Sequence, residues 1–140
     1  MALELTIVTP EGEAFASAIE SVVLPGTEGE FGVLEAHERL LTALQPGPVE
    51  IRGADGAASQ WAAVTDGFVE VTGEHVVVLV DHCILAGDID AATAEKDRAE
   101  AAEELRGLSG AEENETRREE LEKAIAIAEV RIDVAGRTSA

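Results

Sequence analysis

The stretch ILAGDIDAATA, residues 84–94, lies where the character of the chain changes. Up to Asp88 the chain carries 12 of its 14 valines, 10 of its 13 glycines and all four prolines, and beyond that point it is rich in alanine and in charged residues. Valine favours strands, whereas glycine and proline mark the turns between them. The sequence therefore predicts a β-sandwich domain over residues 1–87 and a C-terminal α-helical hairpin over residues 88–140.

Short apolar segments separated by turn residues run through the first of these domains. Leu3, Leu5 and Ile7 alternate with polar residues, which is typical of a half-buried strand. Such segments recur at the short spacing of a sandwich or a barrel. Val76 to Val80 contains no polar residue, so we expect a central strand that is covered on both faces. The expected turns are at residues 10–12, 25–26, 46–47, 53–56, 66–67 and 73.

Two helices are predicted in the second domain. The first has Asp88 or Asp90 as its N-cap and ends at Gly107. Its apolar stripe, at helical spacing, consists of Ala94, Arg98, Ala101, Leu105 and Leu108.

Ser109 and Glu112 have the spacing of a capping box and predict the start of the second helix. This helix has two apolar stripes on different sides, and each stripe is expected to find its own partner, although a single wide core face is an equal alternative. The first stripe is Leu121, Ala124, Ile125, Ala128 and Ile132, and the second is Ile127, Val130 and Val134.

The charge of the chain excludes two classes of partner. Ten Lys and Arg stand against 29 Asp and Glu, which gives a net charge of −19 and a pI near 4.3. Such a surface repels nucleic-acid phosphates and anionic lipid headgroups, so we expect no nucleic-acid binding and no direct membrane insertion. Residues 1–88 contribute −13 and residues 89–140 contribute −6. Solubility and adaptation to high salt both explain this excess of acid.

The compartment follows from what the sequence lacks. Its longest aliphatic run has five residues, far fewer than the ~20 of a membrane-spanning helix. The first residues have no basic and apolar export signal, and the single Cys83 cannot form an internal disulfide. We therefore expect a soluble protein in a reducing cytoplasm.

No motif demands catalysis. Neither lysine follows a glycine as a phosphate loop requires, and the pair His37-Glu38 lacks a second histidine at position 41. Asp81, His82 and Cys83 have the residue types of a thiol nucleophile, but neighbours in a strand point to opposite faces. We expect no catalytic residue, no metal site and no bound cofactor.

One long pattern is specific. It begins with VVLPGTEGEFGVL at residues 22–34 and continues through His37, Leu40-Leu41-Thr42 and Leu44-x-Pro46-Gly47. It extends through Val64-x-x-Gly67-Phe68-Val69-Glu70-Val71, Val76-x-Val78-Leu79-x-Asp81 and Ile89-Asp90. In these residues the chain resembles the epsilon subunit of F-type ATP synthases over its whole length.

The resemblance implies a flattened β-sandwich with a C-terminal α-hairpin at the foot of the central stalk. Such a subunit is not an enzyme: it binds the γ subunit and the c-ring, so that torque passes between the proton channel and the catalytic head. The resemblance also implies a peripheral position at the cytoplasmic face of the cell membrane. In family members the hairpin lies on the sandwich or extends beside γ toward the catalytic β subunits, where it inhibits ATP hydrolysis.

The partner-binding residues follow from the same resemblance. The loop Gly26 to His37 is expected to contact the c-ring and the foot of γ, with Glu30 and His37 as its functional positions. Taken alone, Glu30 is a solvated surface acid and His37 a turn residue. Arg117 and Arg118 form a local basic patch for acidic surfaces of the catalytic subunits, or they pair within their own helix. The family often has Pro or Gly beside this His, where Glu35, Ala36 and Arg39 stand here, so the loop's rigidity differs.

An ATP-binding sensor module is the alternative function, because some family members bind ATP at the folded hairpin. Their hairpin begins with a pattern like I/L-D-x-x-R-A, in which Arg binds phosphate. Here Thr93 stands at the position of that Arg, and nearby acids repel a polyanion. We therefore expect weak ATP binding or none. A small carboxylate-dependent hydrolase is a third hypothesis, supported only by the abundance of acids.

Overall fold

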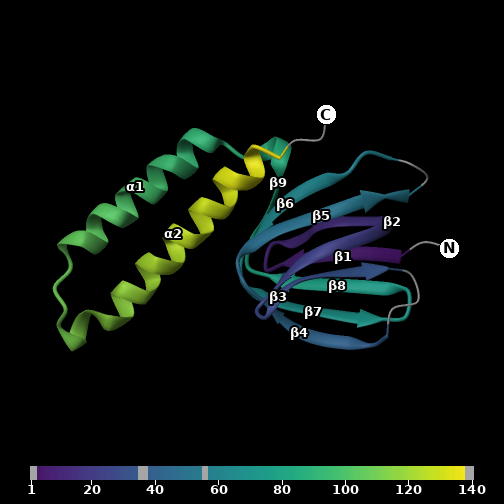
Figure 1. The fold of residues 1–140 in the computed structure, drawn as a ribbon, viewed down its shortest axis with the longest axis horizontal. Helices are drawn as coiled ribbons and strands as arrows, with labels where there is room; N and C mark the ends of the chain where they lie inside the picture. The colour runs from purple at the N-terminus through teal and green to yellow at the C-terminus, as the bar shows by residue number, and fades with distance from the viewer. Residues whose placement is uncertain (1–2, 35–37, 55–56, 138–140) are drawn as a thin grey trace.

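The computed structural model describes residues 3–34, 38–54 and 57–137. It confirms a β-sandwich followed by a pair of helices (Figure 1). The strands are β1 (Leu3–Thr9), β2 (Gly12–Gly26), β3 (Gly29–Leu34), β4 (Leu40–Leu44), β5 (Gly47–Gly53), β6 (Gln60–Val64), β7 (Gly67–Thr72), β8 (His75–Val80) and β9 (Cys83–Leu85). They are followed by the short turn η2 (Ala86–Asp88), helix α1 (Ala91–Gly107), the short turn η3 (Glu112–Asn114) and helix α2 (Glu115–Ala135).

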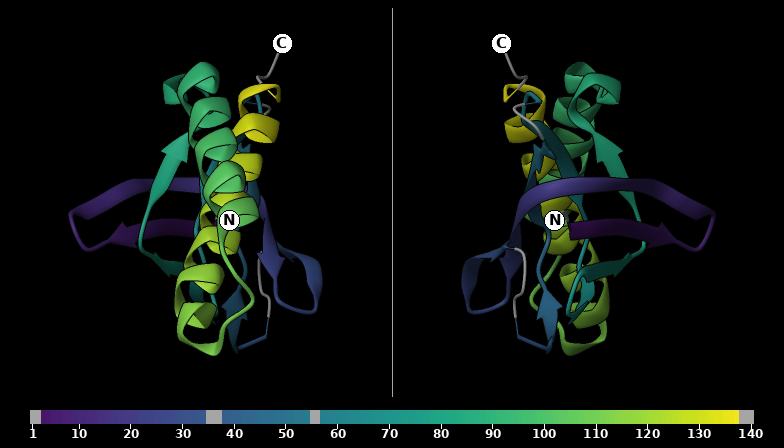
Figure 2. Two further views of the ribbon diagram at one scale, coloured as in Figure 1. Left: turned by 90° about the vertical axis from the view of Figure 1, so that its left-hand side faces the viewer. Right: turned by 90° about the vertical axis from the view of Figure 1, so that its right-hand side faces the viewer.

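The long strand β2 joins the two layers of the sandwich. Its first half pairs with β1, and its second half pairs with β3 and β5. One layer therefore runs β4-β7-β8-β1 with the first half of β2 at its edge, and the other runs β3-β2-β5-β6-β9. The pairing of β1 with β8 is parallel, while the other strand pairs are antiparallel. In Figure 2 the β1–β2 hairpin, in purple, projects to one side of the helices.

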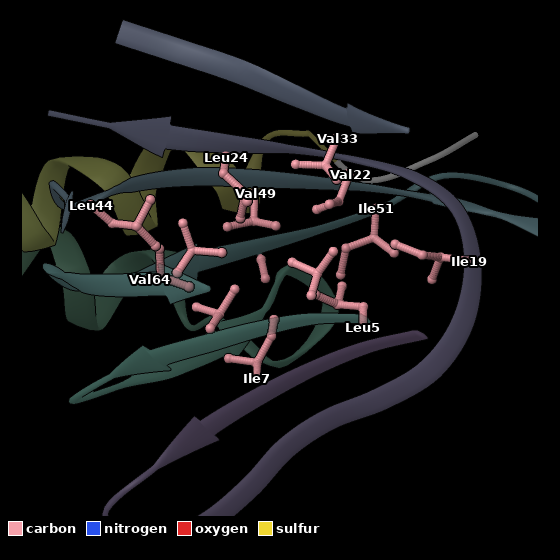
Figure 3. Close-up of a cluster of buried hydrophobic side chains, with 14 of the residues drawn as sticks. Leu5, Ile7, Ile19, Val22, Leu24, Val33, Leu44, Val49, Ile51 and Val64 are labelled. Carbon is pink, nitrogen blue, oxygen red and sulfur yellow. The ribbon is translucent and has the colours of Figure 1, made fainter. Parts of the chain in front are cut away.

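Alternating apolar residues of both layers fill the space between them. Leu3, Leu5 and Ile7 of β1 are fully buried, which confirms the half-buried strand that their spacing predicts. In Figure 3 Leu5 and Ile7 from one layer lie across from Val22, Val49 and Ile51 of the other. Close packing of aliphatic side chains from two sheets is what stabilises a sandwich.

Helix α2 lies between α1 and the sandwich (Figure 1). It contacts β5, β6 and η2, and its second stripe ends in Val134, which is fully buried. Its first stripe includes Leu121 and Ala128, which are buried, as are Ala94 and Ala101 of α1. Helix α2 therefore contacts two different partners, α1 and the sandwich, as two apolar stripes on different sides of a helix predict.

Three local expectations are wrong. Arg98 is exposed and does not belong to the apolar stripe of α1. The second helix begins at Glu115, because Ser109 Oγ accepts hydrogen bonds from the Ala111 N–H (3.4 Å) and Asn114 Nδ2 (2.9 Å) and does not cap a helix. Strand β8 is central but covered on one face only, since Leu79 is 51% exposed.

Candidate functional site

The outward-facing side chains of β1, β8, β7 and β4, here called the outer face, combine an apolar row with exposed polar residues such as Glu70, which lies opposite Leu41. Leu41, Phe68 and Leu79 are 69%, 56% and 51% exposed. Phe68 lies opposite Leu79 on β8 and Ala43 on β4, and Leu79 lies opposite Val8 on β1. One apolar row thus crosses all four strands. Large apolar side chains gathered on an exposed sheet are typical of a protein–protein contact.

Close approach of β7 and β8 builds this row. A Cβ on Gly67 would lie 2.0 Å from the carbonyl oxygen of Leu79, so only glycine allows β7 to begin there. Sequence reasoning missed the outer face because Val76 to Val80 is apolar at every position, which is also typical of a strand covered twice. The signal that could have found it is Phe68, a large aromatic side chain beside a turn in an otherwise aliphatic sequence.

Glu30 lies at a second exposed place, the β2–β3 hairpin. Gly29 closes the turn with φ of +127°, a conformation that favours glycine. Glu30 follows at the start of β3, opposite Pro25, and its side chain is exposed. Gln45 fixes the hairpin, because its Nε2 donates to the carbonyl of Gly26 at 3.1 Å. His37, the other expected contact of this loop, lies outside the described residues.

Arg117 and Arg118 are used within the hairpin in this conformation. Arg117 donates to both carboxylate oxygens of Glu104 on α1, at 2.6 and 2.8 Å, and to Glu120 at 3.1 Å. The ion pair raises the pKa of Arg117 and lowers that of Glu104. Arg118 Nη2 donates to the carbonyl of Ser109 at 2.9 Å. Both side chains therefore hold the two helices and their connection together. Their hydrogen-bond partners within the described residues all lie in the hairpin, and Glu30 is not among them.

The start of α1 shows why Thr93 differs from an arginine. Asp90 caps the helix, accepting from the backbone N–H groups of Ala92 and Thr93, as predicted. The Thr93 hydroxyl donates to Asp90 at 2.9 Å, so its proton is engaged. The backbone N–H and hydroxyl of Thr93 lower the pKa of Asp90, which keeps the cap ionised. This end of the helix therefore presents the ionised carboxylate of Asp90, and position 93 supplies a hydroxyl in place of a cation.

A small cavity of about 220 Å³ lies beside this cap. Its charged lining residues are Asp88, Asp90, Asp97 and Arg131, and Ile84, Ile89, Thr93 and Ala94 complete the lining. Three acids against one cation repel a polyphosphate. Across the described residues, no three His, Cys, Asp or Glu side chains come close enough together to hold a metal ion.

The sequence Asp81-His82-Cys83 forms no activated thiol. Thr65 Oγ1 accepts from the backbone N–H groups of Asp81 and His82, at 3.0 and 3.1 Å, and so shapes the turn before β9. Burial raises the pKa of the Cys83 thiol from 9.0 to about 11. The thiol is therefore protonated at neutral pH and is a poor nucleophile.

Two contacts with the sandwich, one from α2 and one from the residues just after it, were missed by sequence reasoning. Lys123 Nζ lies 2.9 Å from Asp66 Oδ1 in the β6–β7 turn. The guanidinium of Arg137 lies 4.6 Å from the centre of the Trp61 ring on β6. Lys123 precedes the second apolar stripe on its own side of α2, and Arg137 follows the stripe two residues beyond the end of the helix. A cation at each end of this stripe is the signal that could have revealed both contacts.

The ATP synthase delta/epsilon chain β-sandwich family matches residues 2–86. The chain is similar to the ATP synthase epsilon chain of Magnetococcus marinus, with 37% identity over 123 residues, 87% of this chain and 88% of that one. It is 45% identical over 82 residues to the epsilon chain of Helicobacter acinonychis, which covers 59% of this chain and 65% of its relative. Against this relative, the match spans slightly less than two thirds of its length.

Two solved assemblies contain chains of the same fold. A chain of the Euglena gracilis mitochondrial ATP synthase, in a structure of OSCP, F1 and the c-ring, aligns with a TM-score of 0.79 at 23% identity, over 97% of this chain and 82% of that one. A chain of the Tetrahymena thermophila mitochondrial ATP synthase central stalk and c-ring aligns with a TM-score of 0.60 at 15% identity, over 94% and 97%. At these identities the likeness concerns the fold.

Proposed function

Because this chain belongs to the epsilon-chain family of F-type ATP synthases, we propose that it is a non-catalytic rotor subunit that couples γ to the c-ring. The observation that carries the proposal is the outer face, on which Leu41, Phe68 and Leu79 are more than half exposed. A reaction centre would need convergent polar groups, whereas an apolar sheet surface suits a stable protein partner. We assign this face to the γ subunit.

The β2–β3 hairpin is the second proposed contact. Glu30 is exposed at its tip and carries a charge that can pair with basic loops of the c-ring. His37 completes the contact that the family implies. Glu30→Ala combined with His37→Ala should weaken proton pumping by a reconstituted ATP synthase. Unchanged pumping together with unchanged subunit affinity would reject this assignment.

The helical hairpin is the proposed brake on ATP hydrolysis. In an extended position its basic side chains, including Arg117 and Arg118, would meet acidic surfaces of the catalytic β subunits. A chain ending at Asp88 should then assemble normally and raise the hydrolysis rate of the enzyme. Equal rates with the truncated and intact chains would argue against the brake.

The proposal places the chain peripherally, at the cytoplasmic face of the cell membrane, as a part of the ATP synthase. Neither described helix is long and apolar enough to span a bilayer. Attachment would therefore come from the protein partners.

Co-purification tests the proposed rotor role. The tagged chain, added to an ATP synthase depleted of its own epsilon chain, should retain γ and the c-ring. Phe68→Asp places a charge in the outer face and should abolish retention, since an unpaired charge is costly in an apolar interface. Ala99→Glu adds the same charge on the exposed side of α1 and serves as the matched control. Equal retention by both variants would reject the outer face as the contact.

A further inference from the structure

One face of α2 lies against the sandwich and is here called the docking face. The docking face consists of Lys123, Ile127, Val130 and Val134 of α2, together with Arg137, which lies two residues beyond the end of the helix. At 100° per residue the four helical members fall within about 60° of one another. Val134 is fully buried, and a charged residue stands at each end of the docking face.

The first charged end is the pair of Lys123 with Asp66. The Nζ of Lys123 lies 2.9 Å from Oδ1 of Asp66. That oxygen is closed off from solvent, and no hydrogen-bond donor of the described residues is aligned with it, so Lys123 is its electrostatic partner. Asp66 raises the pKa of Lys123, and Asp81 adds to the effect. Separation of the helix from the turn would leave two charges without their partners.

The second charged end is the contact of Arg137 with Trp61. Arg137 is already oriented by two hydrogen bonds to Asp133, each 3.0 Å long. Its guanidinium lies over the Trp61 ring at 4.6 Å, within the range of a cation–π interaction. Lys123 lies 12 residues before Ala135, the last residue of α2, which is about 18 Å along the helix, and Arg137 follows two residues later.

Packing between these two ends is thin. A groove of about 480 Å³ separates Lys123 and Ala126 of α2 from Phe68 and the segment Ala43 to Pro46. Of the three aliphatic residues of the docking face, Val134 is buried, whereas Ile127 and Val130 are only partly so. Hydrophobic burial therefore contributes less to this contact than it does inside the sandwich.

Net charge opposes the same contact. Residues 1–88 carry −13 and residues 89–140 carry −6, so the sandwich and the hairpin repel each other at long range. The docked arrangement brings the two acidic parts together with one cation at each end of the docking face.

We propose that the Lys123–Asp66 and Arg137–Trp61 contacts form an electrostatic latch between two mutually repelling parts, and that docking of the hairpin strengthens as ionic strength rises. The Debye length falls from about 30 Å at 0.01 M salt to about 10 Å at 0.1 M. Added salt therefore removes the long-range repulsion first. A contact of 2.9 Å with a solvent-shielded oxygen is much shorter than either length and is screened far less. This behaviour belongs to the chain itself and does not depend on its proposed partners.

Trp61 is a native reporter of docking, because it is the only tryptophan of the chain and lies under Arg137. Quenching of its fluorescence by acrylamide, a neutral probe, measures how far the ring is uncovered. The full-length chain is compared with Lys123→Gln and with Lys96→Gln as the matched control. Lys96 lies on α1 and pairs with Glu100 at 3.9 Å, so its removal makes the same change in net charge within the hairpin.

Lys123→Gln should raise the quenching of Trp61, whereas Lys96→Gln should behave as the parent chain. Loss of the ion pair corresponds to about a fivefold weaker docking equilibrium, the upper end for a half-exposed pair. Because about 18 Å of helix separates position 123 from the end of α2, which lies beside Arg137 and Trp61, a purely local effect of the substitution is not expected at Trp61. For the parent chain, quenching should fall as NaCl increases from about 0.01 to 0.1 M.

Two results would overturn the latch. Equal quenching in the Lys123→Gln and Lys96→Gln chains would show that the pair does not position the hairpin. If quenching of Trp61 in the parent chain rises with salt, docking weakens as ionic strength increases. The salt response is then dominated by screening of the local attraction and not of the long-range repulsion. Asp66→Asn provides the second variant, since it removes the other partner and should reproduce the effect of Lys123→Gln.

Discussion

Phe68 on β7 and Leu79 on β8 lie directly opposite each other, and each exposes more than half of its side chain. Their sequence neighbours Val69 and Val78 are also paired, but both are fully buried in the sandwich. Val69 and Val78 thus pack in the core, while Phe68 and Leu79 lie on the exposed surface. The buried pair contributes to stability, and the exposed pair belongs to the surface that we propose for partner binding.

Alanine substitutions at these pairs should have different consequences for stability. Val69→Ala or Val78→Ala creates a cavity in the core and should cost about 2 kcal/mol of unfolding free energy. Phe68→Ala and Leu79→Ala remove exposed groups and should cost less than about 1 kcal/mol. Urea denaturation of the isolated chain measures both. A Phe68→Ala chain as unstable as Val69→Ala would mean that the outer face is part of the folding core.

Removal of the Asp90 cap should shorten or destabilise α1. Asp90→Ala loses the acceptor for the N–H groups of Ala92 and Thr93, whereas Asp90→Asn keeps an oxygen in place. Circular dichroism during thermal unfolding should therefore show a lower midpoint for the alanine variant. Since the pKa of Asp90 is lowered, its contribution is complete above about pH 4 and is lost as the pH falls further. If Asp90→Ala has the same thermal midpoint as the parent chain from neutral pH down to pH 3, Asp90 does not stabilise α1 as its cap.

Cys83 should make the chain less stable in alkali. The folded chain holds the thiol proton more tightly than the unfolded chain, because burial raises the thiol pKa from 9.0 to about 11. This contribution to stability is complete below pH 9 and is lost as the pH rises to about 11. Cys83→Ala should flatten the pH dependence of the urea midpoint across this interval. If the urea midpoint of Cys83→Ala falls with pH as steeply as that of the parent chain, groups other than Cys83 cause the loss of stability in alkali.

The ion pair of Arg117 with Glu104 should determine how firmly α1 and α2 associate. Arg117→Glu brings like charges together and should lower the thermal midpoint of the hairpin signal. Adding Glu104→Arg restores opposite charges and should recover most of the loss. A double-mutant cycle measures this coupling directly. If Glu100→Arg restores the thermal midpoint of the Arg117→Glu chain as well as Glu104→Arg does, only net charge matters and not the specific pair.

ATP should bind weakly or not at all. The Thr93 hydroxyl donates to Asp90, and the charged residues that line the neighbouring cavity are three Asp and one Arg. Loss of one charge-assisted phosphate contact costs ~1.5–3 kcal/mol, or about one to two decades of affinity. Isothermal titration with Mg-ATP should detect no micromolar binding, and Thr93→Arg should bind more tightly than the parent. A micromolar dissociation constant for the parent chain would contradict this prediction.

The periodic elements could be predicted because their signals are local. Alternation places Leu3, Leu5 and Ile7 in the core, and Asp90 and Gly107 mark the ends of α1. Each depends on a few neighbouring residues, whose turn, cap or strand preferences act independently of the rest of the chain. The division near residue 88 is visible for the same reason.

The remaining features depend on contacts between distant residues. Asp66 has the sequence signature of a turn, and its pairing with Lys123 arises only when α2 lies on the sandwich. The start of α2 shifts to Glu115 because Asn114 competes for the Ser109 hydroxyl. The open face of β8 is invisible in a run of five apolar residues, since strand periodicity reveals a face only when the two sides differ in polarity.

ATP-driven proton pumping by membrane vesicles tests the central claim most directly. Vesicles carrying an ATP synthase depleted of its epsilon chain would receive the intact chain or the Phe68→Asp variant, and proton uptake would be measured per ATP hydrolysed. The intact chain should restore the coupling ratio and the variant should not, because the charge at Phe68 blocks the contact with γ. Two results would contradict the account. The intact chain could fail to restore proton uptake per ATP hydrolysed, or the Phe68→Asp variant could restore it equally well.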